Sequence, residues 1–122
     1  MANPVRSYRD LEVWQAGMDL ADRVYRLSRT FPSDERFGLT SQVRRAAVSV
    51  PSNVAEGWGR GATNEYVQFL RYARGSLYEV ETQVLIAERN GYVDADEVRP
   101  VLEAADRLGR MLLGLIRSLR RL

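Results

Sequence analysis

The 122-residue chain contains no cysteine, no histidine and no lysine, and all eighteen of its basic residues are arginine. Without cysteine there is neither a disulfide framework nor a thiolate nucleophile. Without histidine there is no Ser-His-Asp relay, and zinc sites that need histidine or cysteine ligands are excluded. Without lysine there is no Schiff-base nucleophile and no P-loop lysine. Because only carboxylates, hydroxyls and arginine remain, the composition favours a protein that is not an enzyme and holds no metal or cofactor.

Long apolar runs are also missing. No stretch approaches the ~18 residues that a membrane-spanning helix requires, and the first residues lack the apolar segment of a signal peptide. We therefore expect a cytoplasmic protein without membrane contact. A hydrophobic content of 45% and a charged content of 28% are typical of globular proteins. The length fits a single domain over residues 1–122, with residues 1–9 as an N-terminal arm.

Apolar residues recur at spacings of 3 and 4, which predicts four amphipathic helices. They are expected over residues 10–30, from residue 39 or 40 to glycines at 57, 59 and 61, over residues 63–90, and from residue 94 to the C-terminal region. The first helix carries two neighbouring apolar stripes, more than one core requires. In each of the other three helices one apolar stripe is expected to face the core: Leu39, Val43, Ala46, Val50 and Val54 in the second, Tyr66, Leu70, Ala73, Leu77, Val80, Val84 and Ala87 in the third, and Val98, Val101, Ala105, Leu108, Leu112, Leu115 and Leu119 in the fourth. Short connections between the four helices predict an all-α, antiparallel up-down-up-down four-helix bundle.

Polar residues and glycines mark the expected helix ends. Ser7 or Asp10 is expected to cap the first helix and Thr63 the third. Asn90 and the glycine after it stop the third helix, and Asp94 with Glu97 forms a capping box for the fourth. The Gly-x-Gly-x-Gly run at residues 57–61 follows a helix rather than a strand, so we interpret it as a helix stop and not as a nucleotide-binding loop.

The second helix contains a proline, Pro51. Proline removes the hydrogen bond to the carbonyl of Ala47 and costs a helix interior roughly 3 kcal/mol. We expect a kink there, with the side chains of Ser49, Ser52 and Asn53 bonding the freed backbone groups. The small residues before the proline predict close packing against a neighbouring helix. We refer to the residues around this proline as the structural motif: Arg44, Arg45, Ala46, Ala47, Pro51, Asn53, Glu56 and Gly57.

Five segments together resemble a known family: YRDLEVWQ at residues 8–15, FP at 31–32, GLTSQVRRAAVSVPSNVAEG at 38–57, FL at 69–70 and GSLYEVETQ at 75–83. They resemble the 23S rRNA-intervening sequence proteins, first noticed as reading frames within large-subunit ribosomal RNA genes. The resemblance implies a small cytosolic bacterial four-helix bundle that forms a ring-like homopentamer. It is also similar to the accessory variability protein of diversity-generating retroelements, a basic pentamer that binds a reverse transcriptase and nucleic acid. The resemblance implies no catalytic residues.

Charge is distributed unevenly along the chain. In an antiparallel bundle, one end gathers eight arginines against four acidic residues, a formal net charge of +4. Arginine suits phosphate because its planar guanidinium binds two oxygens at once. Cyclic symmetry would bring this end of every subunit to one side of a ring. The sequence therefore predicts RNA or DNA binding by Arg6, Arg9, Arg60, Arg71, Arg74, Arg117, Arg120 and Arg121. The alternative is a solvated charged surface with internal ion pairs.

Two other functions remain open. Four aromatic residues beyond the expected core, Trp14, Trp58, Tyr72 and Tyr78, fit a scaffold that binds a protein partner without nucleic acid, although packing within the bundle or between its own subunits also explains them. Carboxylate pairs on helix faces, Asp19 with Asp22 and Glu103 with Asp106, fit a magnesium-dependent all-α nucleotide hydrolase. For the second pair, exposed ion pairing with Arg99 and Arg110 is the simpler interpretation.

Overall fold

A computed structural model describes residues 4–121, and residues 1–3 of the predicted arm lie outside this range. Four α-helices account for most of the chain: α1 (Glu12–Ser28), α2 (Leu39–Gly59), α3 (Thr63–Arg89) and α4 (Ala95–Arg120). Short 3-10 helices, Tyr8–Asp10 and Ser33–Glu35, precede α1 and α2. Among residues 4–121 there is no strand. The prediction of an all-α four-helix protein is confirmed.

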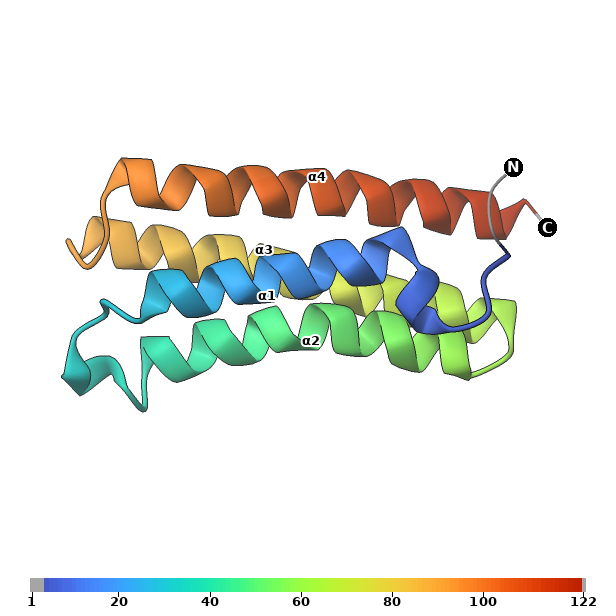
Figure 1. The fold of residues 1–122 in the computed structure, drawn as a ribbon, viewed down its shortest axis with the longest axis horizontal. Coiled ribbons are helices and arrows are strands. Elements are labelled where there is room, and N and C mark those ends of the chain that lie inside the picture. The colour runs from blue at the N-terminus through green and yellow to red at the C-terminus, as the bar shows by residue number, and fades with distance from the viewer. Residues whose placement is uncertain (1–3, 122) are drawn as a thin grey trace.

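The helices lie side by side and the chain reverses direction at each connection (Figure 1). Helix α1 packs against α2 and α4, and α3 packs against the same two helices. The C-terminal ends of α2 and α4, the N-terminal end of α3 and the segment before α1 therefore meet at one end of the bundle. The opposite end holds the α1–α2 and α3–α4 connections, and we refer to it as the far end.

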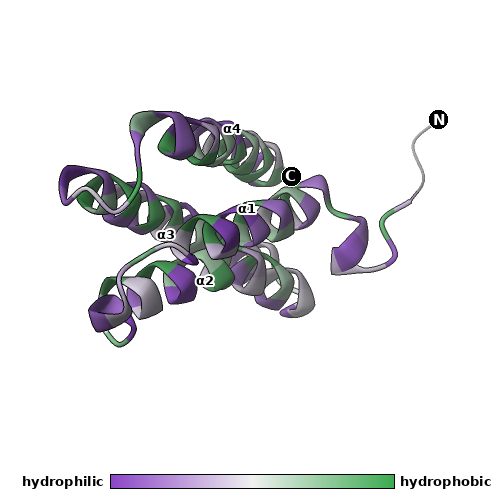
Figure 2. Ribbon diagram, turned by 60° about the vertical axis from the view of Figure 1, so that its left-hand side comes forward, coloured by the Kyte–Doolittle hydropathy of each residue, from purple (hydrophilic) through white to green (hydrophobic). Residues whose placement is uncertain are grey.

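Each helix contributes one apolar stripe to a shared core, and hydrophobic and hydrophilic segments alternate along every helix (Figure 2). The stripes predicted for α2 and α3 are buried, apart from a half-buried Tyr66. In α4 the predicted stripe holds as far as Leu112, but Ile116 is buried next instead of Leu115. An α-helix drifts by about 20° per heptad from a strict 3.5-residue repeat, and this drift explains the change of residue.

The two apolar stripes of α1 have different environments. The stripe that contains Val13, Leu20 and Val24 is buried in the core. The neighbouring stripe is half-buried or exposed, and Met18 and Tyr25 each keep 41% of their surface accessible. Helix α1 thus supplies one core seam and leaves apolar surface on the outside of the bundle.

Two of the predicted helix ends are confirmed and two caps are wrong. Asp94 and Glu97 form a reciprocal capping box at α4. After α3, Gly91 (φ 77°) allows paired hydrogen bonds from its own amide to the Glu88 carbonyl and from the next amide to the Ala87 carbonyl. Thr63 is the first residue of α3 rather than its cap, which is Ala62. Ser7 and Asp10 cap the short 3-10 helix, and α1 begins two residues later than expected.

Helix α2 continues through Pro51 to Gly59. Ser49 donates its hydroxyl hydrogen to the carbonyl of Ala46 at 2.8 Å, and Asn53 donates its side-chain amide to the carbonyl of Ser49 at 2.7 Å. Two of the three predicted side chains therefore bond the backbone near the proline, although neither bonds Ala47. For Ser52, no side-chain hydrogen bond is found among residues 4–121. The kink itself stays a prediction.

Pro51 is buried against α1, where it faces Gly17. A Cβ built on Gly17 would lie 3.3 Å from the Pro51 Cβ, which is tight for two carbon atoms. Even an alanine at position 17 would therefore push α1 and the proline ring apart by a few tenths of an ångström. The predicted close packing around the motif is found, with Ala46 and Ala47 both buried.

Gly57 is part of α2 and does not stop it, which corrects our interpretation of the glycine run. A Cβ built on Gly57 would lie 2.6 Å from the Phe69 Cβ of α3. The glycine is thus required by the approach of the two helices. The turn itself is made by Gly61, whose φ of 82° lies in the region that side chains disfavour.

At the far end, the α1–α2 connection is tied to the α3–α4 connection. Glu35 accepts a hydrogen bond from the Tyr92 hydroxyl at 2.7 Å and another from the backbone amide of Leu39 at 3.1 Å. The second bond satisfies one of the free amides at the start of α2. The hydrogen bond from Tyr92, and then that from Leu39, lower the pKa of Glu35. The same carboxylate raises the pKa of Tyr92.

Candidate functional site

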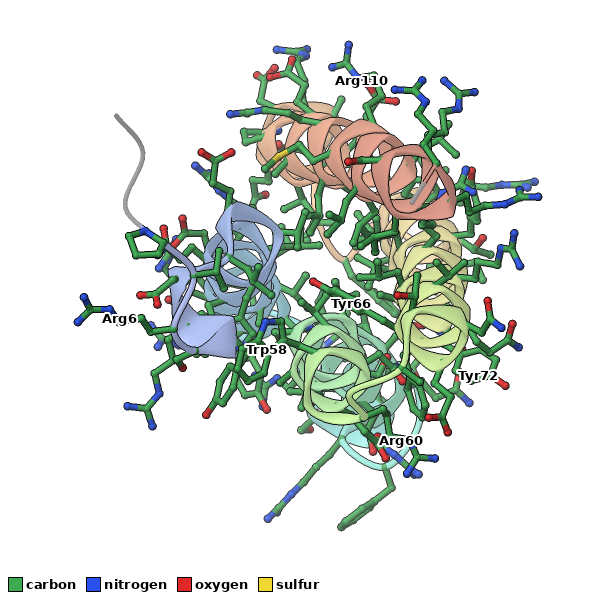
Figure 3. All side chains as sticks on the ribbon, turned by 90° about the vertical axis from the view of Figure 1, so that its right-hand side faces the viewer. Arg6, Trp58, Arg60, Tyr66, Tyr72 and Arg110 are labelled. Atoms are coloured by element: carbon green, nitrogen blue, oxygen red, sulfur yellow. The ribbon has the colours of Figure 1, made fainter. Side chains whose placement is uncertain are left out.

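Seven of the eight candidate arginines are exposed on segments that reach the same end of the bundle. This basic end comprises Arg6, Arg9, Arg60, Arg71, Arg117, Arg120 and Arg121. Figure 3 looks onto it and shows Arg6 and Arg60 pointing outward on different sides of the bundle. These two arginines therefore do not converge on one pocket.

Few of these arginines are engaged by acidic groups. Within residues 4–121, the ion pairs are Arg60 with Glu65 at 3.8 Å, Arg99 with Asp96 at 3.3 Å and Arg110 with Asp106 at 3.3 Å. Only the first of these involves the basic end. The Asp10 carboxylate at this end accepts the backbone amides of Arg6 and Ser7 instead of a guanidinium. If the arginines formed only a solvated charged surface, ion pairs with nearby acidic residues would be expected. At the basic end, such ion pairs are mostly absent from the described residues.

A groove at the basic end lies between α3 and α4 and brings two of the arginines together. Its volume is about 590 Å³, and it is lined from α3 by Thr63, Asn64, Val67 and Arg71 and from α4 by Leu119 and Arg120. Leu119 lies at its edge and is half-buried. Two cations on opposite walls of one groove provide a place where a phosphate group can be bound from both sides.

Arg60 belongs to an aromatic cluster beside this groove. Its guanidinium carbon lies 5.1 Å from the centre of the Phe69 ring, and the Tyr72 ring meets Phe69 edge-on at 5.4 Å between ring centres. Tyr72 keeps 50% of its surface exposed and points away from the bundle (Figure 3). A cation and a half-exposed aromatic side chain thus lie together on the α2–α3 side of the basic end.

Arg74 lies apart from the other seven candidates. It is the twelfth residue of α3, about 16 Å along the helix from its start at 1.5 Å per residue. Its guanidinium is 3.4 Å from the Tyr78 hydroxyl, and it lines a cavity of about 110 Å³ together with Glu81 and Arg110. Burial raises the pKa of Glu81, and the Asp106 carboxylate adds to this. Sequence reasoning missed this cavity, because it depends on how residues of α3 pack against residues of α4, which the pattern within either helix does not reveal.

Two residues of the structural motif have different roles although they are adjacent. Arg44 is half-buried, donates its Nε hydrogen to the Ser28 hydroxyl at 2.8 Å and lies 4.9 Å from the centre of the Tyr25 ring. It therefore joins α2 to the end of α1. Arg45 is exposed and lines a polar groove between α2 and α3. Glu56 is exposed on α2.

The four aromatic residues considered for a protein partner divide into two pairs. Trp14 and Trp58 are half-buried, and Trp14 packs edge-on against Tyr8 at 5.4 Å between ring centres. Tyr72 and Tyr78 remain 50% and 58% exposed. Packing within the bundle thus accounts for much of the two tryptophan surfaces and leaves the tyrosines to be explained.

The carboxylate pairs offer little to a metal ion. Among residues 4–121, no three acidic, histidine or cysteine side chains are grouped closely enough to hold one. Asp106 binds Arg110, as the sequence suggested, whereas Arg99 binds Asp96 and not Glu103. Within the same residues, no helix has the length and apolar character needed to span a membrane.

Comparisons with known proteins complete this description. The model of the family described as 23S rRNA-intervening sequence protein matches residues 9–114. Among solved structures, the chain is similar to a protein with unknown function from the S23 ribosomal protein family of Bacteroides thetaiotaomicron. The TM-score is 0.78 at 17% identity, and the match covers 85% of this chain and 97% of that chain. A likeness at this identity concerns the fold alone. A comparison with curated proteins found no match.

Proposed function

Since the chain belongs to the 23S rRNA-intervening sequence protein family, we propose that it is a non-enzymatic oligomeric scaffold of the cytoplasm that binds nucleic acid through its basic end. The observation that carries this proposal is the exposure of seven arginines on one end, with only Arg60 in an ion pair among the described residues. Unpaired guanidinium groups bind phosphate oxygens without first giving up another partner. The groove between Arg71 and Arg120 is the best-formed phosphate site on that end.

A competing explanation is that these arginines stabilise helix ends. The carbonyl end of a helix carries a partial negative charge, and Arg117, Arg120 and Arg121 lie at the end of α4. Arg26 and Arg29 at the end of α1, and Arg89 at the end of α3, have the equivalent position at the far end. They provide a matched control, because their removal costs similar helix-end interactions without touching the basic end.

The experiment compares two triple variants with the unaltered protein in a salt series. Arg71→Gln/Arg117→Gln/Arg120→Gln should weaken binding to RNA and duplex DNA and reduce the dependence of log K on log salt by about two to three units. Arg26→Gln/Arg29→Gln/Arg89→Gln should leave affinity and slope unchanged. Absence of binding at low salt, or an equal loss in both variants, would reject nucleic-acid binding at this end.

We also propose that the oligomer is a homopentamer. Support comes from exposed apolar side chains on two different sides of the bundle, away from the basic end: Tyr25, Phe37 and Val48 on α1, α2 and their connection, and Leu85 and Ile86 on α3. Two different patches fit a head-to-tail contact, which closes a ring under cyclic symmetry. Light scattering at micromolar concentration should give five times the 13.9 kDa of one chain. A monomer would reject the proposal.

The second candidate is a scaffold for a protein partner that does not bind nucleic acid. It is favoured by the exposed Tyr78, which borders the cavity of Arg74 and Glu81. The same binding experiment separates the two functions, because a protein-only scaffold shows no salt-dependent affinity for RNA or DNA. Recovery of a partner from a pull-down that is lost with Tyr78→Ala, but kept with Tyr72→Ala at the other exposed tyrosine of α3, would then identify the docking face.

A further inference from the structure

Tyr72 is an exposed aromatic side chain held in a defined orientation. Half of its surface is accessible, yet its ring packs edge-on against Phe69 with an interplanar angle of 82°. Two rings that meet nearly at right angles have a favoured geometry for aromatic pairs. This contact holds the ring while leaving half of the side chain exposed to solvent.

The surroundings of Tyr72 are cationic. Arg60 covers the Phe69 ring on which Tyr72 rests. Arg71 precedes Tyr72 in the chain and, at 100° per residue, projects from the adjoining face of α3 toward the groove that it shares with Arg120. Arg60 therefore lies over the ring that Tyr72 contacts, and Arg71 lies next to Tyr72 on α3. A purely apolar subunit or peptide contact would have to cover these charges at a cost in desolvation.

We propose that Tyr72 is a stacking platform for an unpaired nucleobase, with the adjoining phosphates bound by Arg71 and Arg120 in the groove. The inference rests on the proposed function and names its ligand class: single-stranded nucleic acid, or an unpaired segment of a folded one. Every base offers a flat face to an aromatic ring, so this contact does not depend on sequence. In a duplex the base faces are stacked on one another, and Tyr72 cannot reach them.

The test measures affinity for four labelled probes of one sequence with roughly 16 nucleotides, the upper site size of a small single-strand-binding domain. The probes are unstructured RNA, the same sequence as DNA, and the two corresponding duplexes. The unaltered protein should bind the single strands more tightly than the duplexes. Tyr72→Ala should lose about tenfold in affinity for the single strands and remain unchanged for the duplexes.

Two further variants separate stacking from other roles of the tyrosine. Tyr72→Trp should restore single-strand affinity, because a larger aromatic ring stacks at least as well. Tyr78→Ala is the matched control: its ring is 58% exposed on the same helix, outside the basic end, and should be dispensable for all four probes. Tyr72→Ala should also keep the salt dependence of binding, since it removes no phosphate contact, and it should keep the mass of the oligomer in light scattering.

The outcomes distinguish a failure of stacking on Tyr72 from a failure of nucleic-acid binding as a whole. If the protein binds nucleic acid but Tyr72→Ala binds the single strands as well as before, stacking on Tyr72 is wrong and the phosphate-binding proposal stands. A preference for the duplexes would contradict stacking on Tyr72 in the same way. If Tyr72→Ala instead changes the mass of the oligomer, the ring is a contact between subunits. Absence of binding to all four probes at low salt rejects both proposals together. A difference between the RNA and DNA single strands would identify the natural class.

Discussion

Gly57 of α2 and Phe69 of α3 approach so closely that a methyl group on the glycine would lie 2.6 Å from the Phe69 Cβ. Atoms attached directly to two helix backbones cannot swing aside as a long side chain does. The helices themselves must separate before any larger residue fits. The absence of a side chain at Gly57 thus determines how closely α2 and α3 can pack. The basic end lies directly beyond this position.

Replacement of Gly57 by alanine should destabilise the protein, although alanine is the better helix former. We expect a loss of about 1–3 kcal/mol in the free energy of unfolding, the usual cost of overpacking. Gly75→Ala in α3 is the matched control, because a Cβ there has nothing within 4 Å; it should stabilise the protein by up to about 1 kcal/mol. Urea unfolding followed by circular dichroism measures both. A neutral Gly57→Ala would contradict the close approach.

Arg44 and Arg45 should differ although they are neighbours with the same side chain. Arg44→Ala removes the hydrogen bond to Ser28 and the contact with the Tyr25 ring, and we expect it to lower the free energy of unfolding by roughly 1–2 kcal/mol. Arg45→Ala, at an exposed position, should stay within about 0.5 kcal/mol of the unaltered protein. Thermal unfolding of the two variants side by side provides the comparison. Equal effects would mean that the Arg44 contacts contribute nothing measurable.

The Ser49 hydroxyl should be more important than that of Ser52. Ser49 holds the Ala46 carbonyl and lies 2.6 Å from the Ser76 hydroxyl of α3, so Ser49→Ala leaves both groups short of a partner. We expect a loss of about 1–3 kcal/mol, the range for unsatisfied buried polar groups. The exposed Ser52 is the control, and Ser52→Ala should change stability little. Chemical denaturation resolves the difference, and comparable losses would count against a special role for Ser49.

Because of Glu35, the free energy of unfolding should depend on pH in the acid range. Its pKa is below the ordinary value of 4.5 in the folded protein, so the unfolded chain takes up a proton first. The stabilisation by its carboxylate is therefore complete above pH 4.5 and disappears as the pH falls through the folded-state pKa. Glu35→Gln should lack this part of the dependence, and its stability deficit at pH 7 should shrink on acidification.

The measurement for Glu35 is a set of urea unfolding curves between pH 7 and pH 3, with Glu103→Gln as an exposed control. Tyr92→Phe tests the same connection from its other side, because it removes the donor of the 2.7 Å hydrogen bond. If the free energy of unfolding of Glu35→Gln ran parallel to that of the unaltered protein at every pH, the Glu35 carboxylate would not be the source of the pH dependence.

The parts of the fold that were predictable are those encoded locally. The capping box of Asp94 and Glu97 and the stop at Asn90 involve residues within one helical turn, so their spacing alone identifies them. The apolar stripes are similarly periodic within each helix. The choice between two stripes on α1 was not local, because it depends on which side faces α2 and α4. The sequence could not distinguish the buried Leu20 from the exposed Met18 by residue type.

The features that were missed join segments far apart in the chain. Glu35 lies 57 positions before Tyr92, and nothing in either local sequence indicates the partner. Gly57 resembled a helix stop because glycine often ends helices, whereas its actual role is set by Phe69 on the next helix. For the basic end, the expected antiparallel order of the helices predicted which segments meet there, and seven of the eight arginines lie on those segments. The position of Arg74 near the middle of α3 shows that nearness in sequence to Arg71 did not define the site.

The contact between Gly17 and Pro51 also bears on which alignments of the bundle are possible. Helices with a seven-residue apolar repeat can in principle slide past one another by one heptad and still pair apolar stripes. Sliding α1 by that amount would bring Val24 to the place of Gly17, where 3.3 Å is left for even a single methyl carbon. The contact between Gly17 and Pro51 therefore helps to fix the register of α1 on α2. It penalises the shifted bundles that the periodic pattern alone would permit.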